Sequence, residues 1–230
     1  MKDFISSSVF FGFFISILGY EVGLLLKRKF RIALFNPLLI SIIFVIVVLL
    51  VFHIDYENYN NGAKYLSFLL TPATVCLAIP LYQQLDLLKN NIKAIIGGIL
   101  SGVITSLTGI LLFSLLFHFT HEQYVTLLPK SITTAIGMGV SEELGGIVTI
   151  TVAVIIITGV LGNMLAEIIC KVFRIKEPIA KGIALGTASH AIGTAKALEM
   201  GEIEGAMSSL AIAVTGLITV VGASIYANFL

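Results

Sequence analysis

The sequence predicts an all-α polytopic membrane protein with about six full spans and two shorter, opposed segments that are re-entrant or broken helices. Two observations lead to this fold class. Of the 230 residues, 57% are hydrophobic and 12% are charged, whereas a soluble domain carries about 25% charged residues. The hydrophobic residues also gather in runs of about 20, the length that a helix needs to cross a bilayer. We therefore expect a single transmembrane domain over residues 1–230, in contact with the lipid bilayer.

Six runs are long enough and poor enough in charge to be full spans. They are residues 4–26, 32–54, 65–85, 94–117, 144–166 and 205–230. The first run is longer than the hydrophobic part of a typical signal peptide and lacks a small-residue cleavage site, so we expect it to be a span. The longest polar connection, Asp55–Lys64, contains Asn-Gly, and this pair predicts an external turn.

Two weaker hydrophobic segments, 128–143 and 182–200, are expected to enter the membrane without crossing it as regular spans. Lys and Arg accumulate on the cytoplasmic side, so the basic loops at 27–31 and 171–181 should both be inside. With six spans, this holds only if 128–143 enters and leaves from the outside, while 182–200 enters from the inside. Irregular polar backbone at membrane depth is tolerated where it lines a cavity or is buried in protein.

These two segments share a short pattern at an offset of 56 residues. The residues TTAIG at 133–137 and SHAIG at 189–193 are each followed by Glu and Gly at the same spacings. A match this short can also arise by chance or from shared composition. A true repeat would place two similar elements on opposite faces, which is the inverted-repeat architecture of many transporters, with the substrate near the midplane.

Small polar residues of both segments, with two from the third span, are the candidate substrate-binding residues. Polar and ionisable groups at membrane depth are costly and often functional, and helix N-termini attract anions. His190 is the candidate for a substrate ligand or for proton coupling, because histidine titrates near neutral pH. The full set is Thr71, Thr74, Lys130, Ser131, Thr133, Thr134, Ser189, His190, Gly193 and Thr194.

Structural explanations remain open for parts of this set. Pro72 and Pro80 break or kink a helix, so the third span is either a kinked packing helix or an unwound helix that faces the site. Residues 128–137 form either the anion-attracting mouth of a site or a capped interfacial helix with Lys130 at the surface. We expect Asn163, in the fifth span, to make an interhelical hydrogen bond.

Other function classes lack support in the sequence. Small residues spaced by four, Gly98, Gly102 and Ser106, allow close helix packing, including packing in a homo-oligomer. We find no nucleophile elbow, no phosphate-binding loop and no His or Cys cluster at metal-site spacing. We therefore expect no enzyme activity, no cofactor, no bound metal and no nucleic-acid partner.

Three stretches resemble the LrgB/CidB family: TPATVCLAIPLYQQ at 71–84, LLPKSITTAIGMGVSEELGG at 127–146 and KGIALGTASHAIGTAKALEMGEIEGAMSSLA at 181–211. The similarity covers essentially the whole chain. It implies a multi-pass protein of the bacterial cytoplasmic (inner) membrane, often paired with a small LrgA/CidA-type membrane protein. Two functions attach to the family: holin/antiholin-like control of murein hydrolases and lysis, and transport of small organic acids, as in the related plastidial glycolate/glycerate translocator.

The transport interpretation uses more of the sequence. A carrier of a small carboxylate needs hydroxyl donors, positive helix ends and a titratable group, and the two short segments supply all three. A regulator of lysis needs self-association but none of these features. We therefore expect a transporter of pyruvate-like or glycolate-like monocarboxylates. Antiholin-like regulation of murein hydrolase activity is the alternative, and a scaffold subunit for the partner is a third possibility.

Overall fold

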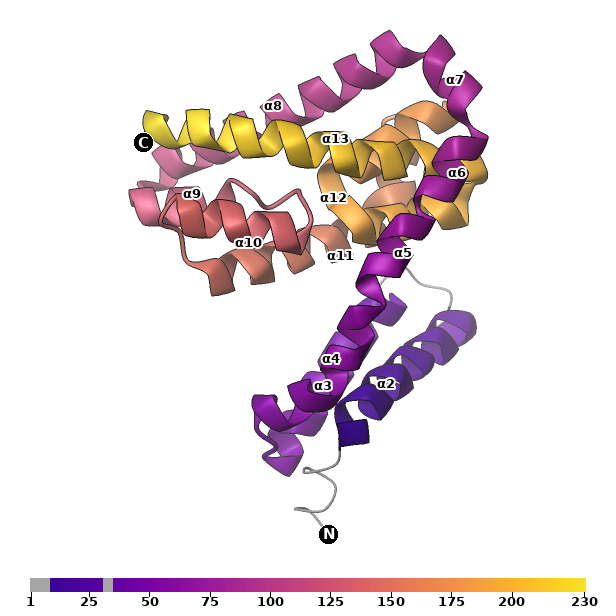
Figure 1. The fold of residues 1–230 in the computed structure, drawn as a ribbon, viewed down its shortest axis with the longest axis vertical. Helices are drawn as coiled ribbons and strands as arrows, with labels where there is room; N and C mark the ends of the chain where they lie inside the picture. The colour runs from indigo at the N-terminus through magenta and orange to yellow at the C-terminus, as the bar shows by residue number, and fades with distance from the viewer. Residues whose placement is uncertain (1–8, 31–34) are drawn as a thin grey trace. The chain divides into compact units, whose positions relative to one another are not determined.

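The computed structural model describes residues 9–30 and 35–230, apart from the side chains of Val9, Leu70, Thr71 and Thr74. Every regular element in these residues is a helix. Contacts along the chain group it into two compact units, Met1–Cys76 and Leu77–Leu230. Figure 1 traces the helices of each unit.

Small residues of one helix organise the first unit. Its described elements are α2 (Val9–Phe30), α3 (Pro37–Phe52), α4 (Tyr56–Phe68) and α5 (Leu70–Cys76). A Cβ on Gly12 of α2 would overlap the backbone of α4 at Tyr59, and a Cβ on Gly23 would meet the backbone of Pro37 in α3. Ser16 of α2 also hydrogen bonds the Tyr59 hydroxyl at 2.8 Å. Such close approach at small residues is typical of helix packing in membranes.

The second predicted span, 32–54, corresponds to α3, which has 16 residues. Asn36 caps its start, because its Oδ1 accepts hydrogen bonds from two backbone N–H groups of the first turn. Pro37 suits the first helical position, and His53 ends the helix in a left-handed conformation with φ 50°. At 1.5 Å per residue, α3 is about 24 Å long, shorter than the predicted span because both caps lie inside it.

The third predicted span, 65–85, is not one helix. It is divided among the end of α4, α5 and α6 (Ala78–Gln83), with turns at Leu69 and Leu77. Pro72 and Pro80 explain these turns. Each proline lacks an N–H group, and its ring clashes with the carbonyl four residues earlier, so the helix is interrupted just before each proline.

The prediction of an external turn at Asp55–Lys64 is wrong. These residues form the N-cap and most of α4. The Asn-Gly pair lies within the helix, and Gly62 is buried. Packing of α4 against Gly12 of α2 therefore outweighs the low helix propensity of Asn and Gly, which costs at most about 1 kcal/mol per residue.

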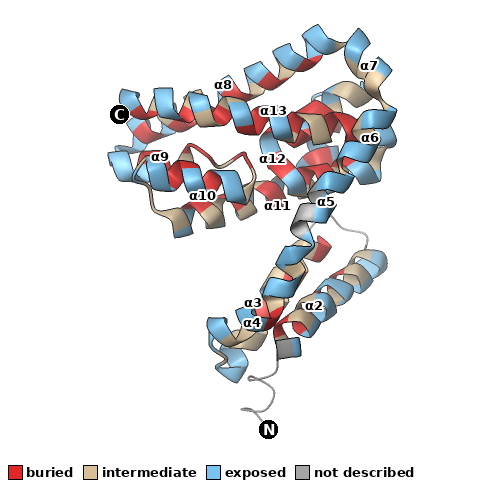
Figure 2. Ribbon diagram, in the orientation of Figure 1, coloured by how far each residue is buried: buried red, intermediate tan, exposed pale blue. Residues whose placement is uncertain are grey.

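The second unit contains the long central helices. Its described elements are α6, α7 (Leu85–Asn90), α8 (Ile92–Phe117), α9 (His121–Leu127), α10 (Thr134–Glu143), α11 (Val148–Val172), α12 (Pro178–Met200), α13 (Glu202–Tyr226) and a 3-10 helix at Ala227–Phe229. The core lies where α8, α12 and α13 pack together, and their buried residues are shown in Figure 2. Ile95, Ile99, Val103 and Leu107 form a buried stripe along α8 at four-residue spacing, as expected for one helix face.

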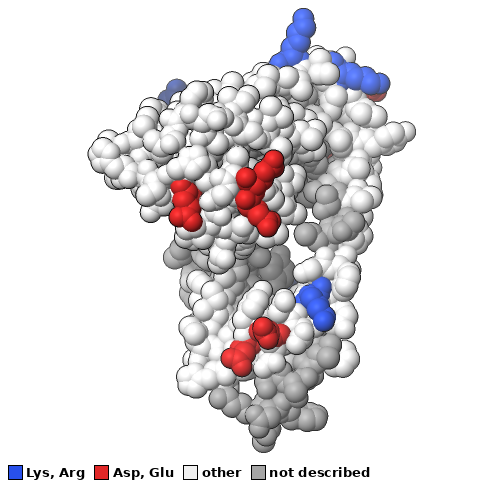
Figure 3. Space-filling model, turned by 60° about the vertical axis from the view of Figure 1, so that its left-hand side comes forward, with Lys and Arg blue, Asp and Glu red and all other residues white. Residues whose placement is uncertain are grey.

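Four helices in the described residues are long and apolar enough to cross a membrane: α2, α8, α11 and α13. They coincide with the predicted spans at 94–117, 144–166 and 205–230 and with the described part of 4–26. Large apolar side chains are exposed on all four. On the face drawn in Figure 3, charged side chains are few and are separated by uncharged surface. The chain is therefore an all-helical membrane protein whose helices contact lipid.

Neither of the two shorter segments is a regular span. In 128–143, a non-helical stretch precedes α10, whose 10 residues reach about 15 Å, half the thickness of the hydrocarbon core. The segment 182–200 lies in α12, which is interrupted at Ser189 and His190. Entry of the two segments from opposite faces of the membrane stays a prediction.

Candidate functional site

A cavity of about 870 Å³ lies in the second unit between α8, the first half of α12 and the loop that precedes α10. This volume is within the range of small-molecule sites. Lys130 and Glu177 are the charged residues that line it. Hydroxyl groups come from all three elements: Ser101, Thr105, Ser106, Ser131 and Thr187. Among the described residues, the cavity thus offers one cation, one carboxylate and several hydroxyl groups, between otherwise mostly small or apolar side chains.

Glycines of α8 bring it close to α12 beside the cavity. A Cβ on Gly102 would lie 2.6 Å from Cγ2 of Thr187, and one on Gly98 would lie 3.3 Å from Cγ2 of Ile183. The hydroxyl of Ser106, the next small residue in the series, lies 3.3 Å from the Ser131 hydroxyl. The small residues predicted to allow close packing therefore do so within this chain.

Lys130 lines the cavity, and its ammonium group is held by a neighbouring hydroxyl. Its Nζ donates a hydrogen bond to Oγ of Ser131 at 2.9 Å, and Ser131 is buried. Lys130, Ser131 and Ser106 therefore form a chain of polar groups that joins the loop to α8. A cation next to hydroxyl groups favours an anionic ligand, because all of these groups can donate hydrogen bonds to it.

The loop that carries Lys130 is fixed by buried hydroxyl groups. Oγ1 of Thr151, in α11, donates to the carbonyl oxygen of Thr126 at 2.9 Å and is hydrogen bonded to Oγ of Ser141 at 2.7 Å. Oγ1 of Thr126 in turn accepts from the backbone N–H of Ile147 at 2.8 Å. These bonds tie α9, α10 and the start of α11 together, so the loop between α9 and α10 has a defined position.

Thr187 was missed as a candidate from the sequence. It lines the cavity and is only 5% exposed, yet its Oγ1 has no hydrogen-bond partner among the described residues. Buried hydroxyl groups are normally hydrogen bonded, and each exception needs an explanation. A ligand in the cavity would supply the missing partner. The available signal was its position in the same Gly- and Ser-rich stretch as Ser189 and His190.

The break in α12 occurs at Ser189 and His190. Their backbone angles are φ −132°, ψ 15° and φ 42°, ψ −140°, and the second pair is rare for any residue other than glycine. Nε2 of His190 lies 2.9 Å from the carbonyl oxygen of Ile155 in α11. A carbonyl only accepts hydrogen bonds, so Nε2 carries the proton and donates it.

Two glycines of α11 leave room for the break. A Cβ on Gly159 would lie 2.7 Å from the His190 ring, and a Cβ on Gly162 would overlap the Ser189 side chain. The irregular backbone is therefore buried against helix α11, as expected for non-helical backbone at membrane depth. Ser189 and His190 are each 3% exposed.

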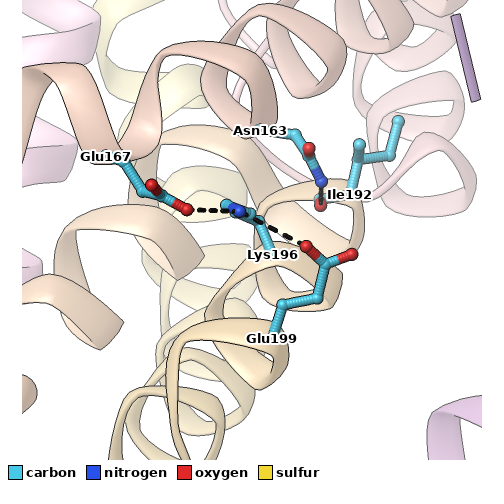
Figure 4. A network of polar contacts seen from close by, with 5 residues as sticks. All are labelled: Asn163, Glu167, Ile192, Lys196 and Glu199. Carbon is cyan, nitrogen blue, oxygen red and sulfur yellow. Dashed lines mark hydrogen bonds and ion pairs between the residues drawn. The ribbon is translucent and has the colours of Figure 1, made fainter. Parts of the chain in front are cut away.

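Polar contacts also fix the second half of α12, as Figure 4 shows. Nδ2 of Asn163 donates to the carbonyl oxygen of Ile192 at 2.8 Å, which confirms the predicted interhelical hydrogen bond. Lys196 forms ion pairs with Glu167 of α11 at 2.6 Å and with Glu199 at 3.3 Å. These contacts, together with the His190 bond, join α11 to the second half of α12 along its length.

Ile155 contacts both short segments. Its carbonyl oxygen accepts the His190 bond, and a Cβ on Gly137 of α10 would lie against its Cδ1. The start of α10 at Thr134 and the break at His190 are separated by the same 56 residues as the sequence pattern. Residues of both short segments therefore contact one residue of α11.

The predicted site residues fall into three groups. Lys130 and Ser131 line the cavity. Ser189, His190, Gly193 and Thr194 are buried at and beyond the break and are not among the residues that line the cavity, although the adjoining Ala188 is.

The third group starts α10: Thr133 is its N-cap and Thr134 its first residue, and both are half-buried. The side chains of Thr71 and Thr74 lie outside the described residues. Oγ1 of Thr194 is hydrogen bonded to Oγ of Ser208 in α13 at 2.7 Å and donates to the His190 carbonyl at 3.1 Å. Its hydroxyl therefore links α12 just after the break to α13.

Apolar spanning helices, a broken helix and a cavity lined by Lys130 and hydroxyl groups define the chain as an all-helical membrane protein with a candidate ligand site. Comparison with known proteins gives the family: a model of the LrgB-like family matches residues 16–229, and the chain belongs to this family. It is 40% identical over 222 residues to the antiholin-like protein LrgB of Bacillus mycoides, Bacillus cereus and Bacillus anthracis, covering 96% of this chain and 96% of each relative. No solved structure matches the chain.

Proposed function

We propose that this protein transports small organic acids across the bacterial cytoplasmic membrane and binds the carboxylate in the cavity beside Lys130. The observation that carries the proposal is the unpartnered hydroxyl of Thr187, which lies in the same cavity as the ammonium group of Lys130. A lysine and free hydroxyl groups are the donors that a carboxylate accepts from. A small monocarboxylate, such as a 2-oxo or 2-hydroxy acid, has both the charge and the extra oxygen that these donors suit.

The broken helix supports transport over a purely structural role. Discontinuous helices near the middle of the membrane form the substrate sites of many carriers. In this chain the break directly follows the cavity residues Thr187 and Ala188. A backbone conformation that is costly, by roughly 1–3 kcal/mol, persists where surrounding contacts impose it, and such sites are often functional.

The arrangement of elements supports the inverted-repeat part of the proposal. The interrupted pairs α9–α10 and the two halves of α12 are each followed by a long apolar helix, α11 and α13. If these pairs enter from opposite faces of the membrane, α11 lies between them. Each pair could then close one entrance to the substrate site, and opening the two entrances in turn would give alternating access. The small LrgA/CidA-type partner would then complete the pathway or regulate it.

The names of the relatives favour a second function. The Bacillus proteins are called antiholin-like, which fits regulation of murein hydrolase activity and lysis. The two functions predict different dependence on the cavity, because lysis control by self-association needs no ligand. Loss of lysis control in a variant that changes only the cavity would connect the two functions.

Uptake by purified protein in sealed vesicles tests the proposal. We expect saturable uptake of labelled pyruvate or glycolate, measured with and without the LrgA-type partner. Lys130→Gln should reduce uptake at least tenfold, since Lys130 is the one cation among the described residues that line the cavity. Lys93→Gln is the matched control, because Lys93 is exposed on α8 and does not line the cavity. If correctly folded protein takes up no short carboxylate, alone or with the partner, the transport proposal is wrong.

A further inference from the structure

A second cavity, of about 330 Å³, lies at the C-terminal end of α11 and is separate from the candidate transport site. Cys170 is one of the residues that line it, and this residue is 8% exposed. Four cations line it: Lys171 and Arg174 at the end of α11, Lys176 in the following loop, and Lys181 in α12. The proposed function uses none of these groups.

A specific turn brings the cations together. Arg174 has φ 54°, its N–H donates to the carbonyl of Lys171 at 3.2 Å, and the N–H of Ile175 donates to the carbonyl of Cys170 at 2.8 Å. These two bonds define a Schellman motif at the helix end. The motif reverses the chain, so the loop residue Lys176 returns over the end of α11 instead of continuing away from it.

The charge of this cavity is not balanced by the protein. Lys181 has an acidic partner, Glu204, at 3.7 Å, and Glu167, the carboxylate that lines the cavity, pairs with Lys196. In the part of the chain that the structure describes, no ion pair involves Lys171, Arg174 or Lys176. Three cations therefore surround one hollow without a counter-ion, which favours an anionic ligand.

The surface next to the cations is apolar. Ile168, Ile169, Val172 and Phe173 on the last turns of α11 are between 42% and 73% exposed. Since α11 is a candidate membrane span, these side chains suit acyl chains, and its charged end lies where lipid headgroups are found. Basic pockets at helix ends bind the headgroups of anionic lipids, at about 1 kcal/mol for each Lys or Arg.

We propose that this cavity binds the phosphate of an anionic phospholipid, with the acyl chains along the apolar end of α11. Arg174 suits one phosphate oxygen pair because its guanidinium donates two parallel hydrogen bonds. Lys171 and Lys176 add point charges on either side. The adjoining apolar side chains make a lipid the better occupant than free phosphate, which would gain nothing from them.

Lipid-dependent stabilisation of the purified full-length protein tests this site. In a neutral detergent, dioctanoyl-phosphatidylglycerol should raise Tm in a saturable way, because a ligand of the folded state stabilises it. Dioctanoyl-phosphatidylcholine should give no comparable rise. In the triple variant K171Q/R174Q/K176Q the rise should be lost, while K27Q/R28Q/K29Q, which removes three cations at the end of α2, should keep it.

Each alternative has its own outcome. If inorganic phosphate stabilises the protein at the same concentrations as phosphatidylglycerol, the ligand is free phosphate and the lipid proposal fails. If the triple variant keeps the rise, or the α2 variant loses it, the cavity is not the site. Should the triple variant fold poorly, Lys171→Gln alone should weaken phosphatidylglycerol binding about fivefold, measured as lipid retained in native mass spectrometry. An unchanged affinity would overturn the proposal. None of these measurements depends on transport.

Discussion

The side chain of His190 donates a hydrogen bond from Nε2 to the carbonyl oxygen of Ile155 across 2.9 Å, while the backbone of the same residue adopts φ 42°, ψ −140°. The same residue thus interrupts α12 and bonds the interrupted segment to α11. This hydrogen bond offsets part of the conformational free energy that the unusual backbone angles cost. Separating these two effects by substitution is the most direct test of how the break is maintained.

Replacing His190 by Ala and by Gly should give different stabilities. Both variants lose the bond to Ile155, but only Gly adopts φ 42°, ψ −140° without steric cost. We expect His190→Gly to be more stable than His190→Ala by about 1 kcal/mol, measured by thermal unfolding in detergent. The opposite order would mean that the break is not retained in these variants. Uptake by the Gly variant then shows whether the imidazole itself has a role in proton coupling.

Thr187→Val and Thr194→Val form a matched pair. Oγ1 of Thr187 has no described partner, so a methyl group in its place should not lower the free energy of unfolding, because no hydrogen bond is lost and a buried unpaired hydroxyl is costly; it should, however, raise the KM for uptake. Thr194→Val removes bonds to Ser208 and to the His190 carbonyl and should destabilise by about 1–3 kcal/mol. An unchanged KM in a stable Thr187→Val protein would show that this hydroxyl does not contact the substrate.

Gly102→Ala should close part of the cavity. The added Cβ would lie 2.6 Å from Thr187 Cγ2, so α8 and α12 must move apart or Thr187 must rotate, and uptake should fall. Gly109→Ala is the control in the same helix, because a Cβ there meets nothing within 4 Å. Alanine is a better helix former than glycine by about 1 kcal/mol, so the control should be at least as stable as the wild type. Equal uptake by both variants would contradict the proposed position of the site.

Arg174→Gly should stabilise the protein. Arg174 adopts a left-handed conformation, which costs a residue other than glycine about 1 kcal/mol. Lys171→Gly removes the same charge from a helical position of α11 and should destabilise it by about 1 kcal/mol. Thermal unfolding of both in phosphatidylcholine separates the backbone effect from lipid binding. If the two variants shift Tm in the same direction, the turn after α11 differs from the one described.

Much of the fold was predictable because hydrophobic length is a strong signal. The runs at 94–117, 144–166 and 205–230 coincide with long apolar helices. The run at 65–85 did not become one helix because proline removes local hydrogen bonds whatever the surrounding hydrophobicity. The helix over Asp55–Lys64 could not be predicted from its local composition, because it is stabilised by contacts with Gly12, which lies far away in the sequence.

The candidate site was predictable by segment more than by residue. Lys130, Ser131 and Thr187 line the cavity, but no pattern in the sequence distinguishes Thr187 from Ser189, which does not line it. Which hydroxyl faces the cavity depends on the rotation of α12 about its axis and on the break, and both are set by packing against Gly102 and Gly162. The proton-coupling role of His190 stays a prediction.

The contacts of α11 with the break have a consequence for how this family can change over evolution. Ile155, Gly159, Gly162 and Asn163 meet the break and the residue beyond it at four successive points. One inserted residue between them would rotate the later contacts by about 100° around the helix and bring new side chains against Ser189. Among aligned relatives, we therefore expect amino-acid exchanges in this stretch of α11 but no gaps.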